Sequence, residues 1–190
     1  MSVPFEPLTA LQRHVAYFDP QNTGVITVGN TARQIRALGV GFGWTWFLTL
    51  LIHGALQFKL GFDSKLRLFI RKIDDGIHAG DTGIFGGDGE LRYDVFEQAF
   101  EKAHGKAGPD AWLTHADLYA FMLRDEKWSP AAMFSWAEAK LLLAVAKNRQ
   151  ETVKGALVDV ITKRRLLQFY EGRLLKAVAR CRRVRKLTSG

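Results

Sequence analysis

The stretch from residue 39 to residue 58 contains no charged side chain, although 24% of the whole chain is Asp, Glu, Lys or Arg. A helix of this length just reaches across the hydrocarbon core of a bilayer. Trp44 and Trp46 suit a membrane interface, whereas several glycines and His53 weaken the case for a span. The pattern therefore predicts a helix that is either buried in the protein core or inserted into a membrane or lipid surface.

The residues before this stretch predict a helix–loop–helix unit. Thr9 and Gln12 have the spacing of a capping box, which indicates a helix over residues 9–18. A second helix is predicted over residues 28–38 and ends at Gly39. The loop between the two helices, residues 19–30, has the length of an EF-hand loop, so the unit has EF-hand organisation.

The loop keeps only part of the calcium chemistry of an EF-hand. Asp19 stands at position 1, Gly24 at position 6, and Ile26 at position 8, where paired EF-hands place an aliphatic strand residue. Gln21 at position 3 and Asn30 at position 12 bring no carboxylate, and the bidentate glutamate is missing. We expect calcium to bind weakly or not at all. A weak site would take its ligands from Asp19, Thr23, Val25 and Asn30.

The rest of the chain is predicted to be mainly helical. An amphipathic helix carries Val95, Phe96, Ala99 and Phe100 on one face, and further helices are indicated over residues 114–123, 129–146 and 157–186. The expected fold is mainly α, with a single domain over residues 1–190. Its parts are a degenerate EF-hand at 9–38, a central apolar helical segment at 39–58, a helical part at 59–175 and a basic tail at 176–190.

The cysteine content and the N-terminal sequence limit the cellular compartments in which the protein is expected. Cys181 is the one cysteine of the chain, so no internal disulfide and no CxxC pair for zinc or covalent haem attachment exists. The first residues lack a basic region followed by an apolar run, so they do not predict a signal peptide. We therefore expect an intracellular protein in a reducing compartment.

The charge of the chain is concentrated near its C-terminus. The net charge is +8, and residues 163–186 carry ten Lys or Arg against the single acid Glu171, a local net charge of +9. An anionic lipid surface and a nucleic acid are both possible partners for such a segment, and a solvated, solubilising tail is the third alternative. No aromatic residue interleaves with the basic residues after Tyr170, so nucleic acid is not expected.

Five segments, taken in order, resemble the caleosin family, also known as plant and fungal peroxygenases. They are LQRHVAYFDPQNTGVI (11–26), TARQIRALGVGF (31–42), IHAGDTGIFGGDGELRYDVFEQAF (77–100), MFSWAEAKLLLAVA (133–146) and TKRRLLQFYEGRLL (162–175). The last segment is similar to the family's closing KExxRxxYDGSLF signature, with Tyr170, Gly172 and Leu174 in step.

The resemblance implies a peroxygenase that contains b-type haem, bound by histidine. In this activity a fatty acid hydroperoxide donates one oxygen atom to an unsaturated lipid or another acceptor, by epoxidation or hydroxylation. The resemblance assigns the haem-linked histidines to His14 and His78 and the haem pocket to residues 59–175. It also implies attachment to lipid droplets or membranes, and we expect this attachment to be peripheral.

The chain departs from the family pattern in two places besides its acid-poor loop. No proline lies between Pro20 and Pro109, so the family's proline knot is absent. Asp74 stands at the first histidine of the family's I-H-x-x-x-H pattern, and His78 stands at the second. Calcium dependence and targeting through a proline-containing hairpin are therefore not implied for this chain.

The local sequence around each histidine indicates whether its side chain can act as a ligand. His14 shares a helical face with Leu11, so its imidazole points inward and needs a partner, which a metal can supply. His78 lies in a glycine-rich loop whose aspartates can accept its second N–H and strengthen it as a ligand. His53 either faces the haem or donates a hydrogen bond to a carbonyl. Cys181 is rejected as a ligand because it lies on a basic, exposed tail without an apolar pocket.

Two functions from different classes follow. In the first, the protein is a peroxygenase, and the histidine of His14 and His78 that does not bind iron, or Asp81, moves the proton of the hydroperoxide. In the second, the protein is a non-catalytic structural component of a lipid droplet or membrane surface that uses its apolar and basic segments for anchorage.

Overall fold

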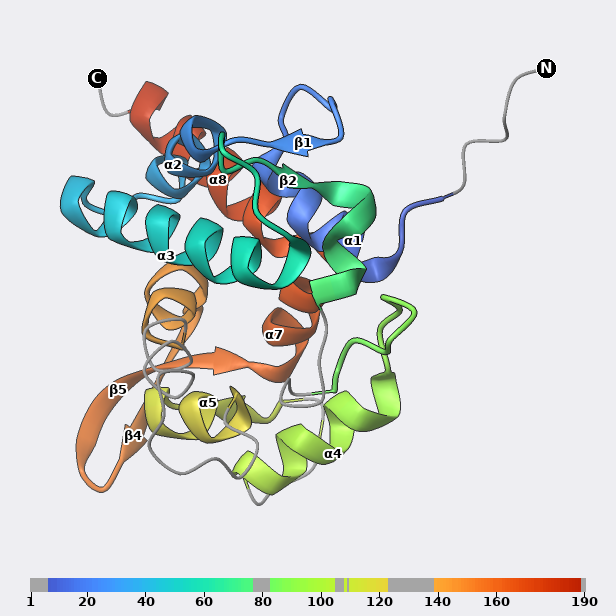
Figure 1. The fold of residues 1–190 in the computed structure, drawn as a ribbon. Helices are drawn as coiled ribbons and strands as arrows, with labels where there is room; N and C mark the ends of the chain where they lie inside the picture. The colour runs from blue at the N-terminus through green and yellow to red at the C-terminus, as the bar shows by residue number, and fades with distance from the viewer. Residues whose placement is uncertain (1–6, 77–82, 105–107, 109, 123–138, 189–190) are drawn as a thin grey trace. The chain divides into compact units, whose positions relative to one another are not determined.

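The computed structural model describes residues 7–76, 83–104, 108, 110–122 and 139–188. The described chain is mainly helical, with small antiparallel sheets (Figure 1). Its contacts group into two compact units. The first takes in Met1–His78, Phe85–Leu91 and Tyr170–Gly190, and the second takes in Ala79–Ile84 and Arg92–Phe169.

The first unit begins with the predicted helix–loop–helix. Its elements are α1 (Ala10–Val15), the 3₁₀ helix η1 (Ala16–Phe18), β1 (Val25–Ile26) and α2 (Val28–Ala37). The capping box is confirmed, since the Gln12 backbone N–H donates to Thr9 Oγ1 at 3.1 Å and the Thr9 N–H donates to Gln12 Oε1 at 3.4 Å. The second helix also ends as predicted, because Gly39 follows it with a φ of 82°.

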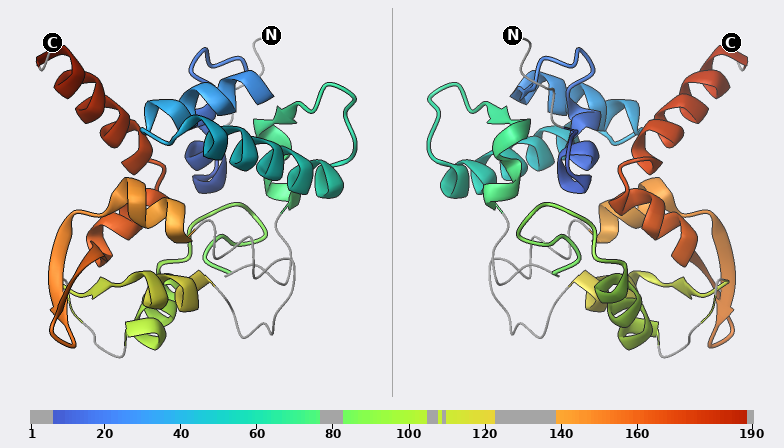
Figure 2. Two further views of the ribbon diagram at one scale, coloured as in Figure 1. Left: turned by 90° about the vertical axis from the view of Figure 1, so that its left-hand side faces the viewer. Right: turned by 90° about the vertical axis from the view of Figure 1, so that its right-hand side faces the viewer.

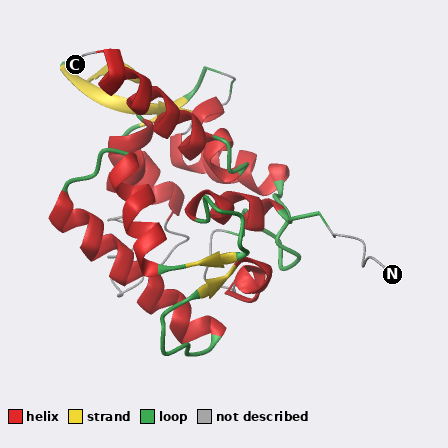
Figure 3. Cartoon of the chain, turned by 90° about the horizontal axis from the view of Figure 1, so that it is seen from above, coloured by secondary structure: helices red, strands yellow, loops and turns green. Residues whose placement is uncertain are grey.

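The side chain of Asp19 accepts the hydrogen bonds that hold the loop between these helices. The buried Asp19 carboxylate accepts a hydrogen bond from the Gly24 N–H at 2.7 Å and from the Thr23 hydroxyl at 3.0 Å. Ile26 lies in β1 opposite Leu68 of β2 (Leu68–Phe69), so the expectation of an aliphatic strand residue at this position is confirmed (Figure 3). This short antiparallel pair joins the loop to the segment that follows the apolar stretch.

The apolar stretch forms α3 (Phe42–Leu60), whose polar side chains face inward. Thr45, Thr49, His53 and Gln57 are spaced by four residues and are all buried. The exposed residues of this helix include large apolar side chains: Phe42, Trp44, Trp46, Phe47 and Leu50. None of the helices in the described ranges is long and apolar enough to cross a membrane. The exposure of these five apolar side chains excludes a fully buried core helix.

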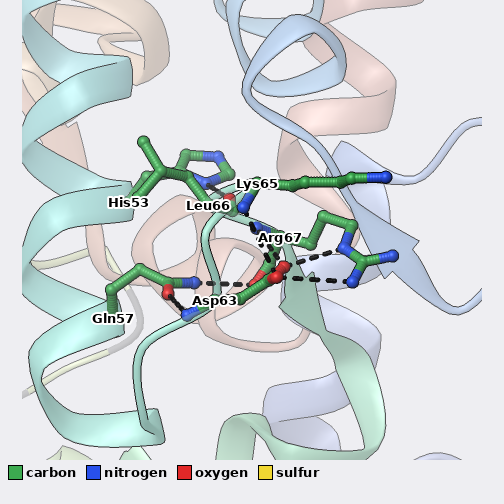
Figure 4. Close-up of polar contacts among 6 residues, drawn as sticks. All are labelled: His53, Gln57, Asp63, Lys65, Leu66 and Arg67. Atoms are coloured by element: carbon green, nitrogen blue, oxygen red, sulfur yellow. Dashed lines mark hydrogen bonds and ion pairs between the residues drawn. The ribbon is translucent and has the colours of Figure 1, made fainter.

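His53 explains the orientation of α3. Its Nδ1 lies 2.7 Å from the Leu66 carbonyl (Figure 4). Its Nε2 lies 2.8 Å from Thr31 Oγ1. A carbonyl only accepts, so Nδ1 carries the proton and Nε2 accepts from the threonine hydroxyl. Of the two alternatives for His53, the hydrogen bond to a carbonyl is the one observed. Burial lowers the pKa of this imidazole, and the hydrogen bond to Leu66 opposes that shift.

The first unit is completed by η2 (Ile70–Gly76), a short hairpin at residues 85–91 and α8 (Leu174–Thr188). The helix α8 lies beside α2, and its residues Leu174, Leu175 and Val178 are buried (Figure 2). Most of the predicted basic tail is thus helical, and its first turns belong to the hydrophobic core of this unit.

The second unit contains the remaining elements. They are α4 (Tyr93–His104), β3 (Trp112–Leu113), α5 (His115–Met122), a helical segment at 139–146, β4 (Arg149–Val153), β5 (Ala156–Thr162) and α7 (Lys163–Tyr170) up to Phe169, with antiparallel strands in the order β3-β5-β4. Phe96 and Phe100 of α4 are fully buried and pack against Phe121, so the apolar face expected on this helix is confirmed. The helix predicted at 114–123 corresponds to α5. Of the helix predicted at 129–146, only residues 139–146 are described.

One helix prediction is wrong in its first part. Residues 157–162 belong to the strand β5 and not to a helix. The cause is local, because β-branched residues are frequent in this segment and Lys154 and Gly155 before it have φ angles of 51° and 80°. Two consecutive residues with positive φ form the turn of a two-residue hairpin, which pairs β5 with β4. The helical part of the prediction begins at Lys163.

The buried neutral His53 makes stability depend on pH. Its pKa is below the ordinary value of about 6.5 in the folded protein, so the unfolded chain binds a proton first as pH falls. The stabilisation is therefore complete above pH of about 6.5 and is lost below it. We expect the free energy of unfolding in urea to fall between pH 7.5 and 5.5.

A His53→Gln variant separates this effect from other titrating groups. We expect it to lose about 1–3 kcal/mol at pH 7.5, because polar partners of His53 lose their hydrogen bonds. The variant should then show a smaller difference between the two pH values than the wild type. Equal pH dependence in both proteins would show that His53 does not set it.

Candidate functional site

His14 lies in the last turn of α1, at one end of a row of three aromatic rings. Its ring centroid is 6.1 Å from that of Phe85, and the Phe85 centroid is 5.7 Å from that of Tyr170. The three residues come from α1, from the hairpin at residues 85–91 and from the end of α7. His14 and Phe85 are half-buried and Tyr170 is buried. The fold thus places one imidazole at the end of a row of rings that come from distant parts of the sequence.

Asp74 fixes the start of the helix that carries His14. Its carboxylate accepts hydrogen bonds from Thr9 Oγ1 at 3.1 Å and from Gln12 Nε2 at 2.6 Å. These donors belong to the two residues of the capping box, whose side-chain oxygens are already used as acceptors within it. Partial burial raises the pKa of Asp74, while the bonds from Thr9 and Gln12 oppose the shift. Asp74 therefore ties η2 to α1 and sets where α1 begins.

The hairpin at residues 85–91 is held against the same end of α1. The Leu11 N–H donates to the Gly89 carbonyl at 2.9 Å. A Cβ atom at Gly89 would lie 2.4 Å from Asp74 Oδ1 and 2.7 Å from Thr9 Oγ1, so a larger residue does not fit. The opposite end of this hairpin carries Phe85, which pairs with Leu91 across it. The contact at Gly89 thus positions the ring that faces His14.

A second glycine brings the chain against α1 at His14 itself. Gly172 has a φ of 74°, and a Cβ atom there would lie 2.8 Å from the Arg13 carbonyl oxygen and 2.9 Å from His14 Cα. The turn between α7 and α8 therefore packs directly on the backbone of α1. Since Tyr170 lies two residues earlier, the same turn places the third ring of the row.

The other predicted site residues have different outcomes. His78 and Asp81 lie outside the described residues. In the loop predicted to bind calcium weakly, the Asp19 oxygens accept from Gly24 and Thr23, the Val25 carbonyl accepts from the Thr23 hydroxyl, and the Asn30 amide donates to Gln21. Within the part of the chain that the structure describes, no group of three or more His, Cys, Asp or Glu is placed to hold a metal ion.

The donor set near His14 fits a haem better than a small cation. The His14 imidazole offers one nitrogen ligand, and the Phe85 ring beside it, which contacts Tyr170 in turn, offers the apolar surface that a macrocycle requires. His53 does not compete for this role because both of its ring nitrogens already have hydrogen-bond partners. Cys181 is exposed, as expected when it was rejected as a ligand.

Sequence reasoning missed the residues that support His14. The sequence presents Asp74 only as a departure at a histidine position and as one of the aspartates that can accept from His78, and it presents Phe85 and Gly172 only as parts of motifs. A signal was present for Gly172, because a glycine inside a stretch predicted as helical can mark a helix end with positive φ. No local signal links Asp74 to Thr9, which lies 65 residues away in the chain.

Comparisons with known proteins agree on one family. Residues 6–179 match the family model described as Caleosin related protein. Probable peroxygenase 4 of Arabidopsis thaliana is 26% identical over 170 residues, which cover 82% of this chain and 86% of the plant protein. A peroxygenase of Lilium longiflorum is 27% identical over 167 residues, which cover 78% of this chain and 66% of the lily protein. No solved structure matches the chain.

The close contact at Gly172 can be tested with a matched pair of glycines. Gly172 and Gly155 have similar φ angles of 74° and 80°, but a Cβ atom at Gly155 meets no atom within 4 Å. Alanine at either position bears the left-handed strain of about 1–2 kcal/mol. We expect Gly172→Ala to destabilise the protein more than Gly155→Ala in urea unfolding, because only Gly172 touches α1. Equal losses of unfolding free energy in the two variants would show that the turn does not pack closely against α1.

Proposed function

Because the chain belongs to the caleosin family, we propose that it is a haem-dependent peroxygenase. The reaction proposed is transfer of one oxygen atom from a fatty acid hydroperoxide to an unsaturated lipid or another acceptor, by epoxidation or hydroxylation. The relatives in Arabidopsis thaliana and Lilium longiflorum are named as peroxygenases. The observation that carries the proposal is His14, held beside Phe85 by a helix that is fixed at its start and along its backbone.

His14 and His78 are the proposed iron ligands. Haem bound there would supply the oxygen-transfer chemistry at its iron. The chain itself contributes position: Asp74 and the turn at Gly172 restrain α1, so the His14 imidazole keeps one orientation. The Phe85 ring, with Tyr170 packed against it, provides an apolar surface beside that imidazole.

The reaction also needs a group that moves a proton. The hydroperoxide O–H must lose its proton when the peroxide binds, and one oxygen must regain a proton when it leaves as an alcohol. We assign this work to the histidine of His14 and His78 that does not hold iron, or to Asp81. Asp74 is not a candidate for it, because its carboxylate oxygens are engaged by Thr9 and Gln12.

We further propose peripheral attachment to a lipid droplet or membrane surface. The outward side of α3 exposes aromatic and aliphatic residues, with Phe42 70% exposed, and carries tryptophans of the kind enriched at lipid interfaces. At the start of α3 the Arg182 guanidinium of α8 lies against Gly39, which brings basic charge to the edge of the apolar side. An apolar side next to cations suits an anionic lipid surface.

A non-catalytic lipid-surface protein is the second candidate. The observation that favours it is the same exposed side of α3, which needs no haem to bind lipid. Absorbance separates the two candidates: protein purified from cells with sufficient haem should show a Soret band. A complete absence of this band would contradict the enzyme proposal and leave the structural one.

The role of His14 is tested by removing its imidazole. We expect His14→Phe to lose most of the bound haem or most of the turnover, because phenylalanine fills the space without a nitrogen ligand. His78→Ala should have the same effect. Cys181→Ser is the matched control, since Cys181 is exposed and carries the only thiol of the chain. The control should keep the wild-type spectrum, and an unchanged His14→Phe spectrum and activity would show that His14 is not a ligand.

Attachment by charge is tested on the exposed side of α8. Deleting residues 176–190 is predicted to weaken binding to anionic vesicles, but it also removes the buried Val178. Substituting the exposed Arg180 and Arg183 by glutamine avoids this problem. We expect weaker flotation with anionic vesicles, by about 1 kcal/mol for each arginine, and an unchanged haem spectrum. High salt should release part of the wild-type protein. If the double variant binds the vesicles as tightly as the wild type, these arginines serve solubility alone.

A further inference from the structure

A small cavity lies at the C-terminal end of α3, in a part of the first unit that shares no residue with the His14 site. Its volume is about 220 Å³. It is lined by Leu60, Gly61, Phe62, Asp63, Arg67, Leu68, Phe69 and Lys72. This volume is below the range of about 300–1,000 Å³ that is typical of sites for whole small molecules. The cavity therefore has room for a head group and not for an entire lipid.

Two cations flank one aromatic ring in this cavity. The Arg67 guanidinium carbon lies 5.5 Å from the Phe69 ring centroid and Lys72 Nζ lies 5.9 Å from it. Arg67 also donates to Asp63, from Nε to Oδ2 at 2.7 Å and from the second terminal nitrogen to Oδ1 at 3.3 Å. These bonds hold the pKa of Asp63 at about 2, so the aspartate stays ionised and neutralises the arginine.

Lys72 is left with a charge that nothing in the cavity balances. It is exposed and, within the described ranges, its one ring contact is with Phe69 and it has no acidic partner. The segment from Asp63 to Lys72 contains four basic residues and one acid, a net charge of +3. The site thus combines an unbalanced lysine, a partly engaged arginine and an apolar ring, and this combination favours an anionic ligand.

Hydrogen bonds hold the loop that forms the cavity wall in one conformation without any ligand. Gln57 of α3 accepts from the Asp63 N–H at 2.5 Å and donates to the Arg67 carbonyl at 2.7 Å, and His53 bonds to Leu66 (Figure 4). Leu66 has a φ of 51°, a conformation that a leucine adopts only under restraint from its surroundings. Phe69 is fixed by the pairing of β2 with β1. A cavity with such a wall loses little conformational freedom on binding.

The neighbourhood of the cavity indicates what kind of anion it receives. The cavity begins where α3 ends, and the next side chain, Phe62, is 82% exposed. The exposed side of α3, from Phe42 to Leu50, carries no charged residue. We propose that this cavity binds the anionic head group of a lipid, a phosphate or a fatty acid carboxylate, while the hydrocarbon part of the lipid layer contacts Phe62 and α3. This inference rests on the lipid-surface part of the proposed function and is independent of the haem.

The experiment compares two lysines of the same loop. Lys72 lines the cavity, whereas Lys65 is an exposed neighbour that does not. Wild type, Lys72→Gln and Lys65→Gln are titrated with phosphatidylcholine vesicles that contain no additive, phosphatidic acid or oleic acid. A cation that only senses the surface potential contributes about fivefold in affinity. We expect Lys72→Gln to weaken binding to at least one anionic vesicle by more than tenfold, and Lys65→Gln by about fivefold or less.

Each outcome has a defined meaning. Loss with phosphatidic acid assigns a phosphate, loss with oleic acid assigns a carboxylate, and either supports the proposal. Equal losses for the two variants, or none, overturn it, because the lysine would then act through the surface potential alone. Competition by millimolar inorganic phosphate that depends on Lys72 would overturn the lipid assignment in favour of free phosphate.

Two controls distinguish failure of the head-group site from failure of the proposed attachment to lipid. If the wild type binds no vesicle of any composition, the attachment proposed above fails as well. If it binds but the two variants behave alike, only the head-group site fails. The urea unfolding of Lys72→Gln should match the wild type, because this exposed side chain has a single ring contact to lose.

Discussion

The placement of α1 depends on one buried interaction, the bond of the Asp74 carboxylate to both residues of a capping box. The capping box by itself satisfies backbone N–H groups at the helix start, and it leaves a hydroxyl and an amide as spare donors. Asp74 accepts from both. Two glycines, Gly89 and Gly172, then allow neighbouring segments to approach α1 more closely than any side chain would permit. The imidazole of His14 is therefore positioned by its helix, and the helix by contacts that tolerate little change.

The orientation of α3 follows from a second set of polar contacts. His53 and Gln57 satisfy the backbone of the loop at residues 61–67, and His53 also accepts from Thr31 of α2. An unsatisfied imidazole or amide in an apolar environment is costly, so the polar side of the helix turns toward the protein. The apolar side then faces outward, the reverse of an ordinary surface helix. One arrangement accounts for the exposed aromatic residues and for the rigid wall of the cavity beside them.

Features encoded locally could be predicted from the sequence, and those set by distant contacts could not. The Thr9–Gln12 capping box, the end of α2 at Gly39 and the strand position of Ile26 each depend on a few neighbouring residues, and all are confirmed. The strand β5 differs from the prediction because the helix expected after residue 163 was extended back to residue 157, over the β-branched segment that follows the hairpin turn at Lys154 and Gly155. The direction of α3 could not be predicted, since Thr31 and Leu66 become its partners only in the folded chain. The resemblance points to His14, whose role stays a prediction, and the contact of Asp74 with Thr9 and Gln12 could not be predicted for the same reason.

The outward side of α3 has a consequence for the protein in water. Contiguous exposed apolar surface drives association between copies, and monomeric soluble proteins rarely leave large patches of it uncovered. A chain whose aromatic residues from Phe42 to Phe47 face the solvent therefore has a strong tendency to self-associate or to take up detergent during purification. Phe42 is the most exposed of these residues, at 70%, so it buries the least of its surface on folding. A polar residue at this position is therefore expected to disperse the protein at little cost to the fold of the first unit.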